Sequence, residues 1–285
     1  MNEQMSPDDP RNYLRDQGFD DYTADDHATW STLARNQRKI LKGRVCDDFL
    51  DGLDRLGISD EGIPDFRVMN QRLKATTGWE VVAVPGLVPD IAFFSLLADR
   101  KFPAGYWIRK PEQIDYIEEP DIFHDVFGHV PLIMQQVYAD YLEAYGKAGL
   151  EAARHGTLHR LARLYWYTVE FGLAETPDGL RIVGAGIASS PSETVFALES
   201  ASPNRIGFDL GRVMSTQYRI DDFQETYFVL PSVDAWPALD LDALIPLWKE
   251  LDQRADLEPG DVLAQDRVIT RGDGTYHSAK RDAAA

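Results

Sequence analysis

Residues 120–172 read PDIFHDVFGHVPLIMQQVYADYLEAYGKAGLEAARHGTLHRLARLYWYTVEFG, and the expected architecture of the chain follows from this stretch. Apolar side chains recur at helical spacing through most of it, which predicts a succession of helices beginning at Pro120. Pro131 interrupts the first helix after about Val130, because its ring cannot continue a regular helix, and Gly172 ends the last one. We expect these helices to form the apolar centre of the protein.

The flanking sequence predicts more helices and only short strands. One long helix is expected from about Asp26 to Leu56, and Pro64 opens a second that ends at Gly78. Further patterns predict a strand in WEVVAVPG (79–86), a helix in DIAFFSLLADR (90–100), a strand in YWIR (106–109), a hairpin in LAETPDGLRIVGAG (173–186), and helices in SPSETVFALES (190–200) and DLDALIPLWKELDQR (240–254). The expected fold class is mostly α, of the α+β kind, with packed helices and short β-hairpins.

The domain organisation is expected to be simple. No internal repeat, low-complexity tract or Gly/Ser linker divides the 285 residues, which predicts a single domain over residues 1–285. Within it, the polar residues 1–22 are expected to form a flexible arm and residues 256–285 a C-terminal tail.

The composition limits the partners of the chain. Lys and Arg total 29 against 47 Asp and Glu, a formal net charge of -18 that repels nucleic-acid phosphates and anionic lipids. Cys46 is the only cysteine, so no intramolecular disulfide can form, and no run approaches the roughly 18 apolar residues of a membrane span. The opening residues MNEQMSPDDPRNYL lack the features of a signal peptide. We expect a cytoplasmic protein with neither nucleic-acid nor membrane partners.

Two of the six histidines, His124 and His129, are five residues apart in an otherwise apolar segment. On a regular helix, residues five apart point roughly 140° away from each other, so convergence on one metal ion requires a distorted helix. Gly128 and Pro131 are residues that distort helices. The spacing alone also allows two histidines that are satisfied separately.

Glu170 is the only charged residue of the apolar run LYWYTVEFGL. A buried carboxylate without a cationic partner is unfavourable, and Gly172 places this one near the negative end of a helix dipole. A metal ion would neutralise the buried carboxylate and offset its repulsion by the helix dipole. An arginine such as Arg160, Arg163 or Arg109 would do the same. Two imidazoles and one carboxylate are the donors of a facial triad, which suits Fe(II) and leaves coordination positions open, whereas structural zinc takes four protein ligands.

Three separated motifs, PDIFHDVFGHVPL, LYWYTVEFG and GAGIASSPSE, closely resemble the pterin-dependent aromatic amino acid hydroxylases. The similarity extends from about Trp79 to Val233 and is strongest to the short bacterial members that act on phenylalanine. It implies an enzyme that hydroxylates L-phenylalanine to L-tyrosine with O2 and a tetrahydropterin, such as tetrahydrobiopterin, at a non-haem Fe(II). It also implies a chain without the regulatory domain and tetramer helix of larger relatives, and hence a monomer.

The resemblance also implies roles for particular residues. It places the iron on His124, His129 and Glu170, and the carboxylate of the amino acid on Arg109, whose planar guanidinium suits a carboxylate. The other residues that it implies for the substrate site are Pro120, Trp166, Ser189, which would orient the first iron histidine, and Glu193. Those that it implies for the pterin site are Phe93, on which the ring would stack, Tyr165, and the backbone of Leu87 and Val88.

Other functions remain compatible with these residues. The same chemistry could act on tryptophan or tyrosine, because the metal ligands are common to all three kinds of enzyme. A zinc hydrolase could use the same ligands with Asp125 or Glu193 as its base. A sensor of amino acids could keep the pocket without turnover. Asp125 also departs from the family, which has a glutamate near the pterin at this position.

Overall fold

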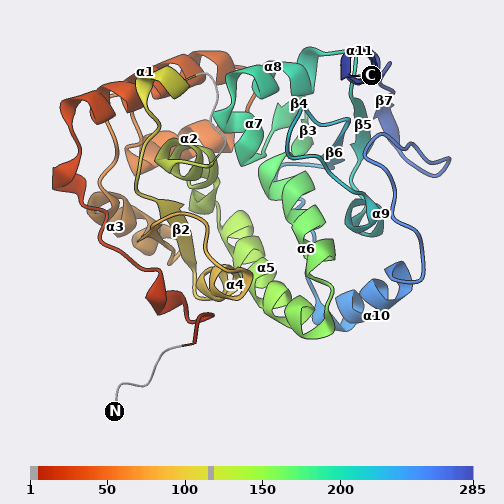
Figure 1. Cartoon of the computed structure of the whole chain (residues 1–285), viewed down its shortest axis with the longest axis horizontal. Helices are drawn as coiled ribbons and strands as arrows, with labels where there is room; N and C mark the ends of the chain where they lie inside the picture. The colour runs from red at the N-terminus through yellow and green to blue at the C-terminus, as the bar shows by residue number, and fades with distance from the viewer. Residues whose placement is uncertain (1–5, 115–118, 285) are drawn as a thin grey trace. The chain divides into compact units, whose positions relative to one another are not determined.

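The computed structural model describes residues 6–114 and 119–284 of the chain (Figure 1). Its backbone separates into two compact units, the first of Met1–Lys39 with Asp47–Gly156 and the second of Ile40–Cys46 with Thr157–Ala285. In the described part of the chain, no helix has both the length and the apolar character needed to cross a bilayer. The expectation of a single domain remains a prediction.

The first unit is mainly helical. Its helices are η1 (Pro10–Asn12), η2 (Phe19–Asp21), α1 (Ala24–Leu41, whose last two residues belong to the second unit), α2 (Asp47–Leu56), α3 (Phe66–Thr76), α4 (Asp90–Ala98), η3 (Pro111–Gln113), η4 (Phe123–His129), η5 (Pro131–Met134) and α5 (Gln136–His155). The segment η4 is a π-helix, and the other η segments named here are 3-10 helices. The predicted succession of helices after Pro120 is confirmed for this unit.

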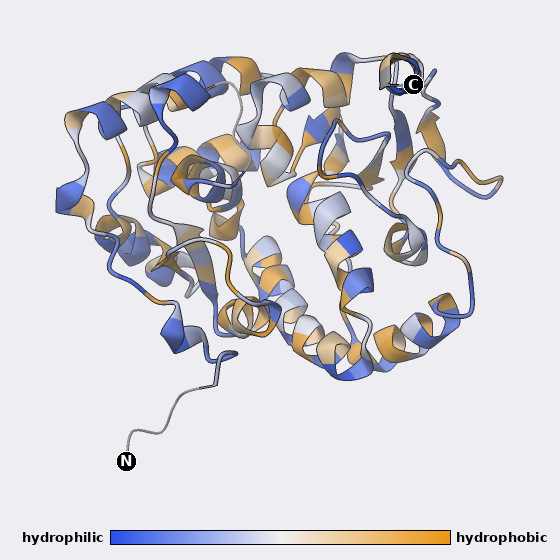
Figure 2. Ribbon diagram, viewed as in Figure 1, coloured by the Kyte–Doolittle hydropathy of each residue, from blue (hydrophilic) through white to orange (hydrophobic). Residues whose placement is uncertain are grey.

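Two parallel strands, β1 (Glu80–Val84) and β2 (Lys101–Gly105), flank the connecting helix α4 in the first unit. Figure 2 shows α4 as largely hydrophobic, and it packs closely on α5. Glycines permit this approach, because a Cβ at Gly146 would lie 2.4 Å from the backbone nitrogen of Ala98 and one at Gly149 would lie 2.0 Å from Cδ1 of Phe94. The unit therefore has a close-packed helical core with one small sheet.

The second unit combines helices with a mixed sheet. Its helices are α6 (Leu158–Tyr165), the π-helix η6 (Trp166–Glu170), α7 (Ala185–Ser189), α8 (Pro191–Glu199), α9 (Leu210–Ser215), α10 (Leu241–Leu251) and α11 (Thr275–Ala284). Its strands are β3 (Leu173–Thr176), β4 (Gly179–Ile182), β5 (Asn204–Gly207), β6 (Thr226–Leu230) and β7 (Val268–Thr270), in the order β4-β3-β6-β5-β7. The central strand β6 is buried along its whole length and parallel to both neighbours, as its apolar composition requires.

The fold class is confirmed, and so is the hairpin of β3 and β4, but three local predictions are corrected. The expected helix from Asp26 to Leu56 is two helices, because the chain turns at Gly43, whose φ of 71° suits glycine. The expected strand YWIR is wrong, since the strand is KFPAG, in which Pro103 conceals the usual strand pattern. The helix expected at Pro64 begins at Phe66, with Asp65 as its N-cap.

The two ends of the chain are structured where they are described. In the segment 6–22, which was expected to be an arm, the backbone nitrogen of Arg15 donates to Ala83 O at 2.9 Å and the side-chain amide of Gln17 donates to Pro64 O at 2.9 Å. In the segment 256–285, which was expected to be a tail, β7 extends the sheet by pairing with β5, and α11 follows it. Both segments therefore form part of their units.

Candidate metal centre and substrate site

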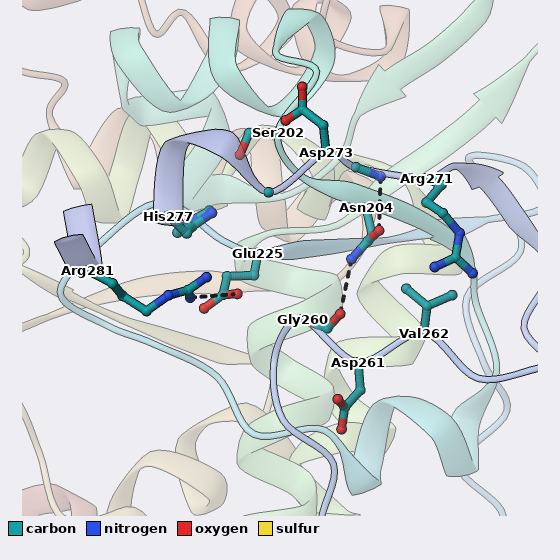
Figure 3. A pocket seen from close by; sticks show the side chains of 12 residues that line it. Ser202, Asn204, Glu225, Gly260, Asp261, Val262, Arg271, Asp273, His277 and Arg281 are labelled. Atoms are coloured by element: carbon teal, nitrogen blue, oxygen red, sulfur yellow. Dashed lines mark hydrogen bonds and ion pairs between the residues drawn. The ribbon is translucent and has the colours of Figure 1, made fainter. Parts of the chain in front are cut away.

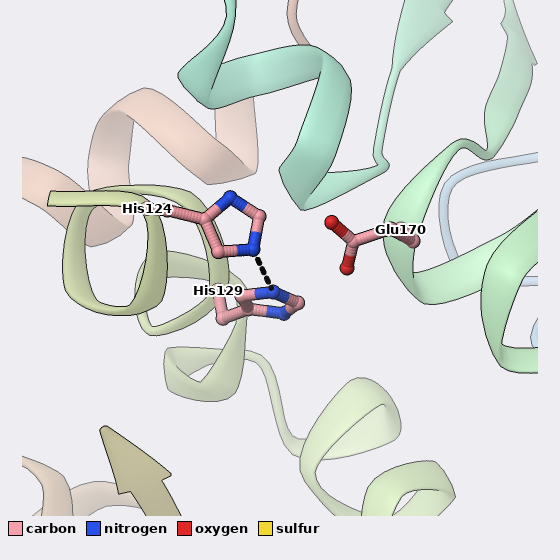
Figure 4. Close-up of side chains that lie close together, drawn as sticks. All are labelled: His124, His129 and Glu170. Carbon is pink, nitrogen blue, oxygen red and sulfur yellow. Dashed lines mark hydrogen bonds between the residues drawn. The ribbon is translucent and has the colours of Figure 1, made fainter. Parts of the chain in front are cut away.

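The two candidate metal-ligating histidines lie on the π-helix η4 in the first unit. A π-helix joins residues five apart, so residues at this spacing come to one side of the helix instead of diverging. The Nε2 atoms of His124 and His129 lie 3.2 Å apart, with the two rings nearly perpendicular at 81° (Figure 4). His129 is buried and His124 is half-buried. The helix distortion that the sequence required is therefore present, and both imidazoles direct a ring nitrogen toward one point.

Asp121 links the helix of the histidines to Arg109. Its Oδ2 accepts hydrogen bonds from the backbone nitrogen and Nε of Arg109 at 3.0 and 2.8 Å, and its Oδ1 accepts one from Nη2 at 2.9 Å. The same Oδ1 accepts from the backbone nitrogen of His124 at 3.1 Å. Burial opposes the charge on Asp121, but the hydrogen bonds and charge of Arg109 outweigh it and hold the pKa of this carboxyl below its usual value.

The sequence analysis did not identify Asp121. The available signal was an aspartate next to Pro120 at the opening of a helix, where acidic side chains accept hydrogen bonds from free backbone N–H groups. That signal is common in helical proteins and says nothing of an arginine twelve residues earlier. Only the folded chain brings Arg109 and Asp121 together.

Two further residues surround the histidine pair within the first unit. The ring of Phe102, on β2, lies against His129 with the centroids 5.1 Å apart. Asp125 accepts a hydrogen bond at Oδ2 from the backbone nitrogen of Gly105 at 2.7 Å, and burial raises the pKa of its carboxyl. The carboxylate of Asp125 is thus tied to the end of β2.

Glu170 is the last residue of the π-helix η6, in the second unit, and is 9% exposed. The glycines of the sequence GAG approach it closely. A Cβ at Gly186 would lie 2.7 Å from Oε1 of Glu170, and one at Gly184 would lie 2.5 Å from its backbone oxygen. These positions accept no side chain without movement, so the two glycines fix the space around Glu170, a role that the sequence analysis did not assign.

The arginines that were considered as partners of Glu170 have acidic partners of their own. Arg160 and Arg163 both donate to Asp256 at 2.6 Å, and the side chain of Arg109 is paired with Asp121. The three arginines that the sequence offered as partners of Glu170 therefore each pair with an aspartate.

The expected substrate residues of the second unit occupy defined positions. Trp166 donates from Nε1 to Gln224 at 2.8 Å, and Ser189 donates to Ala185 O at 2.8 Å. Glu193 is buried and accepts a hydrogen bond from the hydroxyl of Tyr227. Burial raises the pKa of Glu193 to about 7, although the hydrogen bond from Tyr227 acts in the opposite direction.

The remaining expected positions are more open. Pro120 is half-buried and directly precedes Asp121, outside the helix that it was expected to open. Leu87 is 85% exposed in the loop before α4, next to the half-buried Val88. Phe93 is half-buried on α4, and Tyr165 is half-buried at the end of α6. Of the expected pterin residues, Leu87 is the most exposed.

Most of the sequence matches a known family. Residues 16–238 match the model of the biopterin-dependent aromatic amino acid hydroxylases. The chain therefore belongs to this family.

Within this family, the chain is similar to particular bacterial enzymes. The phenylalanine-4-hydroxylase of Chromobacterium violaceum is 54% identical over 268 residues, which cover 93% of this chain and 89% of the relative. That of Ralstonia nicotianae is 57% identical over 251 residues, which cover 88% of this chain and 80% of the relative. The particular members of the family that this chain resembles at this level are thus phenylalanine hydroxylases of bacteria.

Solved structures agree with the sequence comparison. The crystal structure of the Chromobacterium violaceum phenylalanine hydroxylase with iron and phenylalanine bound matches with a TM-score of 0.86 at 52% identity, covering 92% of this chain and 95% of that one. A second structure of the same enzyme, with iron(III) and 7,8-dihydrobiopterin, matches with a TM-score of 0.86 at 54% identity, covering 90% and 93%. The fold described above is the fold of this family.

Proposed function

We propose that this chain is a phenylalanine 4-monooxygenase that converts L-phenylalanine to L-tyrosine with O2 and a tetrahydropterin at a non-haem iron. The sequence identity of 54–57% to bacterial phenylalanine-4-hydroxylases carries this proposal. Solved relatives that hold iron with phenylalanine, and iron with a dihydropterin, support the same substrate and cofactors. The family is one of hydroxylases, so the hydrolase and sensor alternatives have no support from relatives.

We infer that His124, His129 and Glu170 hold the iron. His124 and His129 come from η4 of the first unit and Glu170 from η6 of the second, and each offers one ligand atom for a metal ion (Figure 4). The donor set fits Fe(II), because two neutral imidazoles and a carboxylate are the ligands of a facial triad. The adjacent Nε2 atoms of the histidines and the tightly confined carboxylate support the assignment. Together with the reduced pterin, a bound Fe(II) activates O2 for hydroxylation of an aromatic ring.

Arg109 is proposed to bind the carboxylate of phenylalanine. Its Nε and Nη2 are hydrogen-bonded to Asp121, which orients the guanidinium plane and leaves the N–H groups of Nη1 for another acceptor. Asp121 would thereby act as a positioning residue that ties the substrate carboxylate to the helix of His124. Pro120, Trp166, Ser189 and Glu193 are proposed to complete the substrate site.

The pterin is proposed to bind near the start of α4. Phe93 offers a ring for stacking, and the exposed loop at Leu87 and Val88 offers backbone groups for hydrogen bonds. Tyr165 is the remaining residue that the family resemblance implies for this site. A monomeric state and a cytoplasmic location are further proposals, and the single cysteine supports the second.

The decisive assay supplies the purified chain with Fe(II), a tetrahydropterin and O2, and then with phenylalanine, tryptophan or tyrosine in separate reactions. Formation of tyrosine from phenylalanine, coupled to oxygen uptake, is the expected result. Faster hydroxylation of tryptophan or tyrosine would overturn the substrate assignment. Equal activity of Glu170→Ala and the wild type would overturn the metal assignment.

A further inference from the structure

A half-buried cluster of aromatic rings lies in the second unit around Trp166. The ring of Trp166 stacks on that of Tyr218, with the centroids 4.4 Å apart and the planes 18° apart, and its centroid lies 4.7 Å from that of Phe171. All three residues are half-buried, so the cluster is not closed by other side chains. Its rings offer an apolar surface that matches the aromatic ring of a substrate.

Gln224 joins both members of the stack. Its Oε1 accepts a hydrogen bond from Nε1 of Trp166 at 2.8 Å, and its Nε2 donates to the backbone oxygens of Arg219 at 3.1 Å and Asp222 at 3.3 Å. Arg219 directly follows Tyr218, so one amide holds the indole and the backbone beside its stacking partner. The opposite orientation of the amide would break all three hydrogen bonds. Gln224 is 2% exposed, so water does not replace these partners.

The segment that carries Gln224 is fixed in turn by the last helix, α11. Oδ1 of Asp222 accepts a hydrogen bond from the hydroxyl of Tyr276 at 2.9 Å. The backbone oxygen of Phe223 lies 2.8 Å from Nε2 of His277, a residue that also lines a polar pocket at the C-terminal end of the chain (Figure 3). The two residues before Gln224 are therefore both bonded to α11, and its amide extends from a held backbone.

Gln224 also connects residues that are proposed for the substrate and metal sites. Trp166 is the first residue of the π-helix η6, and Glu170 is its last. A fixed indole therefore holds the start of the helix that carries this carboxylate. Burial raises the pKa of Glu193, whereas hydrogen bonds from the hydroxyl of Tyr227 and from the backbone of Gln224 lower it.

We propose that Gln224 is a positioning residue, which fixes the indole of Trp166 as a wall for the aromatic ring of phenylalanine. The inference rests on the proposed function, because phenylalanine is the substrate of that function. Contacts between aromatic rings depend on the distance and tilt of the rings. Without its acceptor, the N–H group of the indole would be left unpaired, and the ring would turn to find another partner. A displaced indole would hold the substrate ring less tightly.

Binding and turnover of L-phenylalanine by the full iron-loaded chain test this role. Isothermal titration calorimetry without O2 gives the Kd, and steady-state assays give KM and kcat. Gln224→Met keeps the length of the side chain but removes its acceptor and donors. We expect Kd and KM to rise about fivefold or more, with kcat changed less than KM.

Two further variants serve as rescue and control. In Gln224→Glu, a protonated carboxyl again offers an acceptor to the indole and a donor to a backbone oxygen, so the Kd should stay within about threefold of the wild type. Gln253 is an exposed glutamine that follows α10, and Gln253→Met should leave the Kd unchanged. The melting temperature and the Fe(II) affinity of each variant show whether the fold and the metal site are intact.

A double-mutant cycle shows whether the effect passes through the indole. Trp166→Phe lacks the N–H donor, so adding Gln224→Met to it should change the Kd by less than about twofold. An equal loss of affinity in both backgrounds would overturn the proposal, because a glutamine with a purely structural role acts without the indole. If Gln224→Met does not fold, Gln224→Asn makes a smaller change to the same contact, since its amide is one methylene shorter.

The outcomes also separate this inference from the proposed function. A wild-type Kd for phenylalanine in Gln224→Met would overturn the role of Gln224 alone, while the wild type would still bind and hydroxylate phenylalanine. A wild type that neither binds nor hydroxylates phenylalanine would overturn the proposed function, and this inference with it.

Discussion

Gly186 lies against the carboxylate of Glu170, and alanine at this position should weaken iron binding. The added Cβ would lie 2.7 Å from Oε1 of Glu170 and 2.9 Å from Cζ of Phe171. Both contacts are shorter than a real Cβ makes, so the carboxylate or the ring of Phe171 must move to admit the methyl group. Metal sites tolerate errors of only about 0.2 Å in ligand distance, so the carboxylate would leave its place.

The expected loss of iron affinity in Gly186→Ala is roughly 10-fold to 100-fold, the usual effect of disturbing the support of a metal ligand. Titration of the metal-free chain with Fe(II) under anaerobic conditions measures this affinity directly. Gly211→Ala is a matched control in the same unit, because its Cβ would meet its nearest neighbour, Oδ1 of Asp209, at an ordinary 3.6 Å. Iron affinity within twofold of the wild type in Gly186→Ala would refute the reasoning.

Three further predictions concern buried charges. Asp121→Ala leaves the buried Arg109 without its partner and should lower the free energy of unfolding by about 3–5 kcal/mol, whereas Asp51→Ala, at an exposed pair with Arg55, should cost less than about 1 kcal/mol in chemical denaturation. Asp256→Asn should destabilise the fold because it weakens the binding of two buried arginines, and a melting temperature equal to that of the wild type would contradict this. Because burial raises the pKa of Glu193 from 4.5 to about 7, the folded chain keeps a proton that the unfolded chain loses. Stability should therefore fall as the pH rises from 4.5 to 7, and urea denaturation of Glu193→Gln should lack this component of the decline, so an identical pH dependence in both proteins would count against the shift.

Several features of the fold and of the candidate metal site could be predicted from local sequence patterns. Helical spacing predicted the helices between Pro120 and Gly172, and the pattern of residues 173–186 predicted the hairpin. The isolation of Glu170 in an apolar run marks it as a candidate ligand from the sequence alone. These signals succeed because periodicity, turn chemistry and the cost of burying a charge act within a few residues of the chain.

Other features depend on contacts between distant segments. The sequence suggested that His124 and His129 needed a distorted helix, but the π-helical form of the distortion is visible only in the folded chain. The strand KFPAG has a weak strand pattern of its own and forms through its pairing with β1. The same holds for β7, which exists because β5 offers an open edge.

The sequence alone was enough to predict most of the helices, the family motifs and the residue types available for a metal, a carboxylate and an aromatic ring. Only the folded chain shows that Asp121 holds Arg109 and that glycines confine Glu170. Local sequence patterns predict secondary structure because they reflect interactions between residues that are close together in the chain. Ion pairs, steric confinement and pockets arise between residues far apart in the chain, and their energies exist only once the fold brings those residues together.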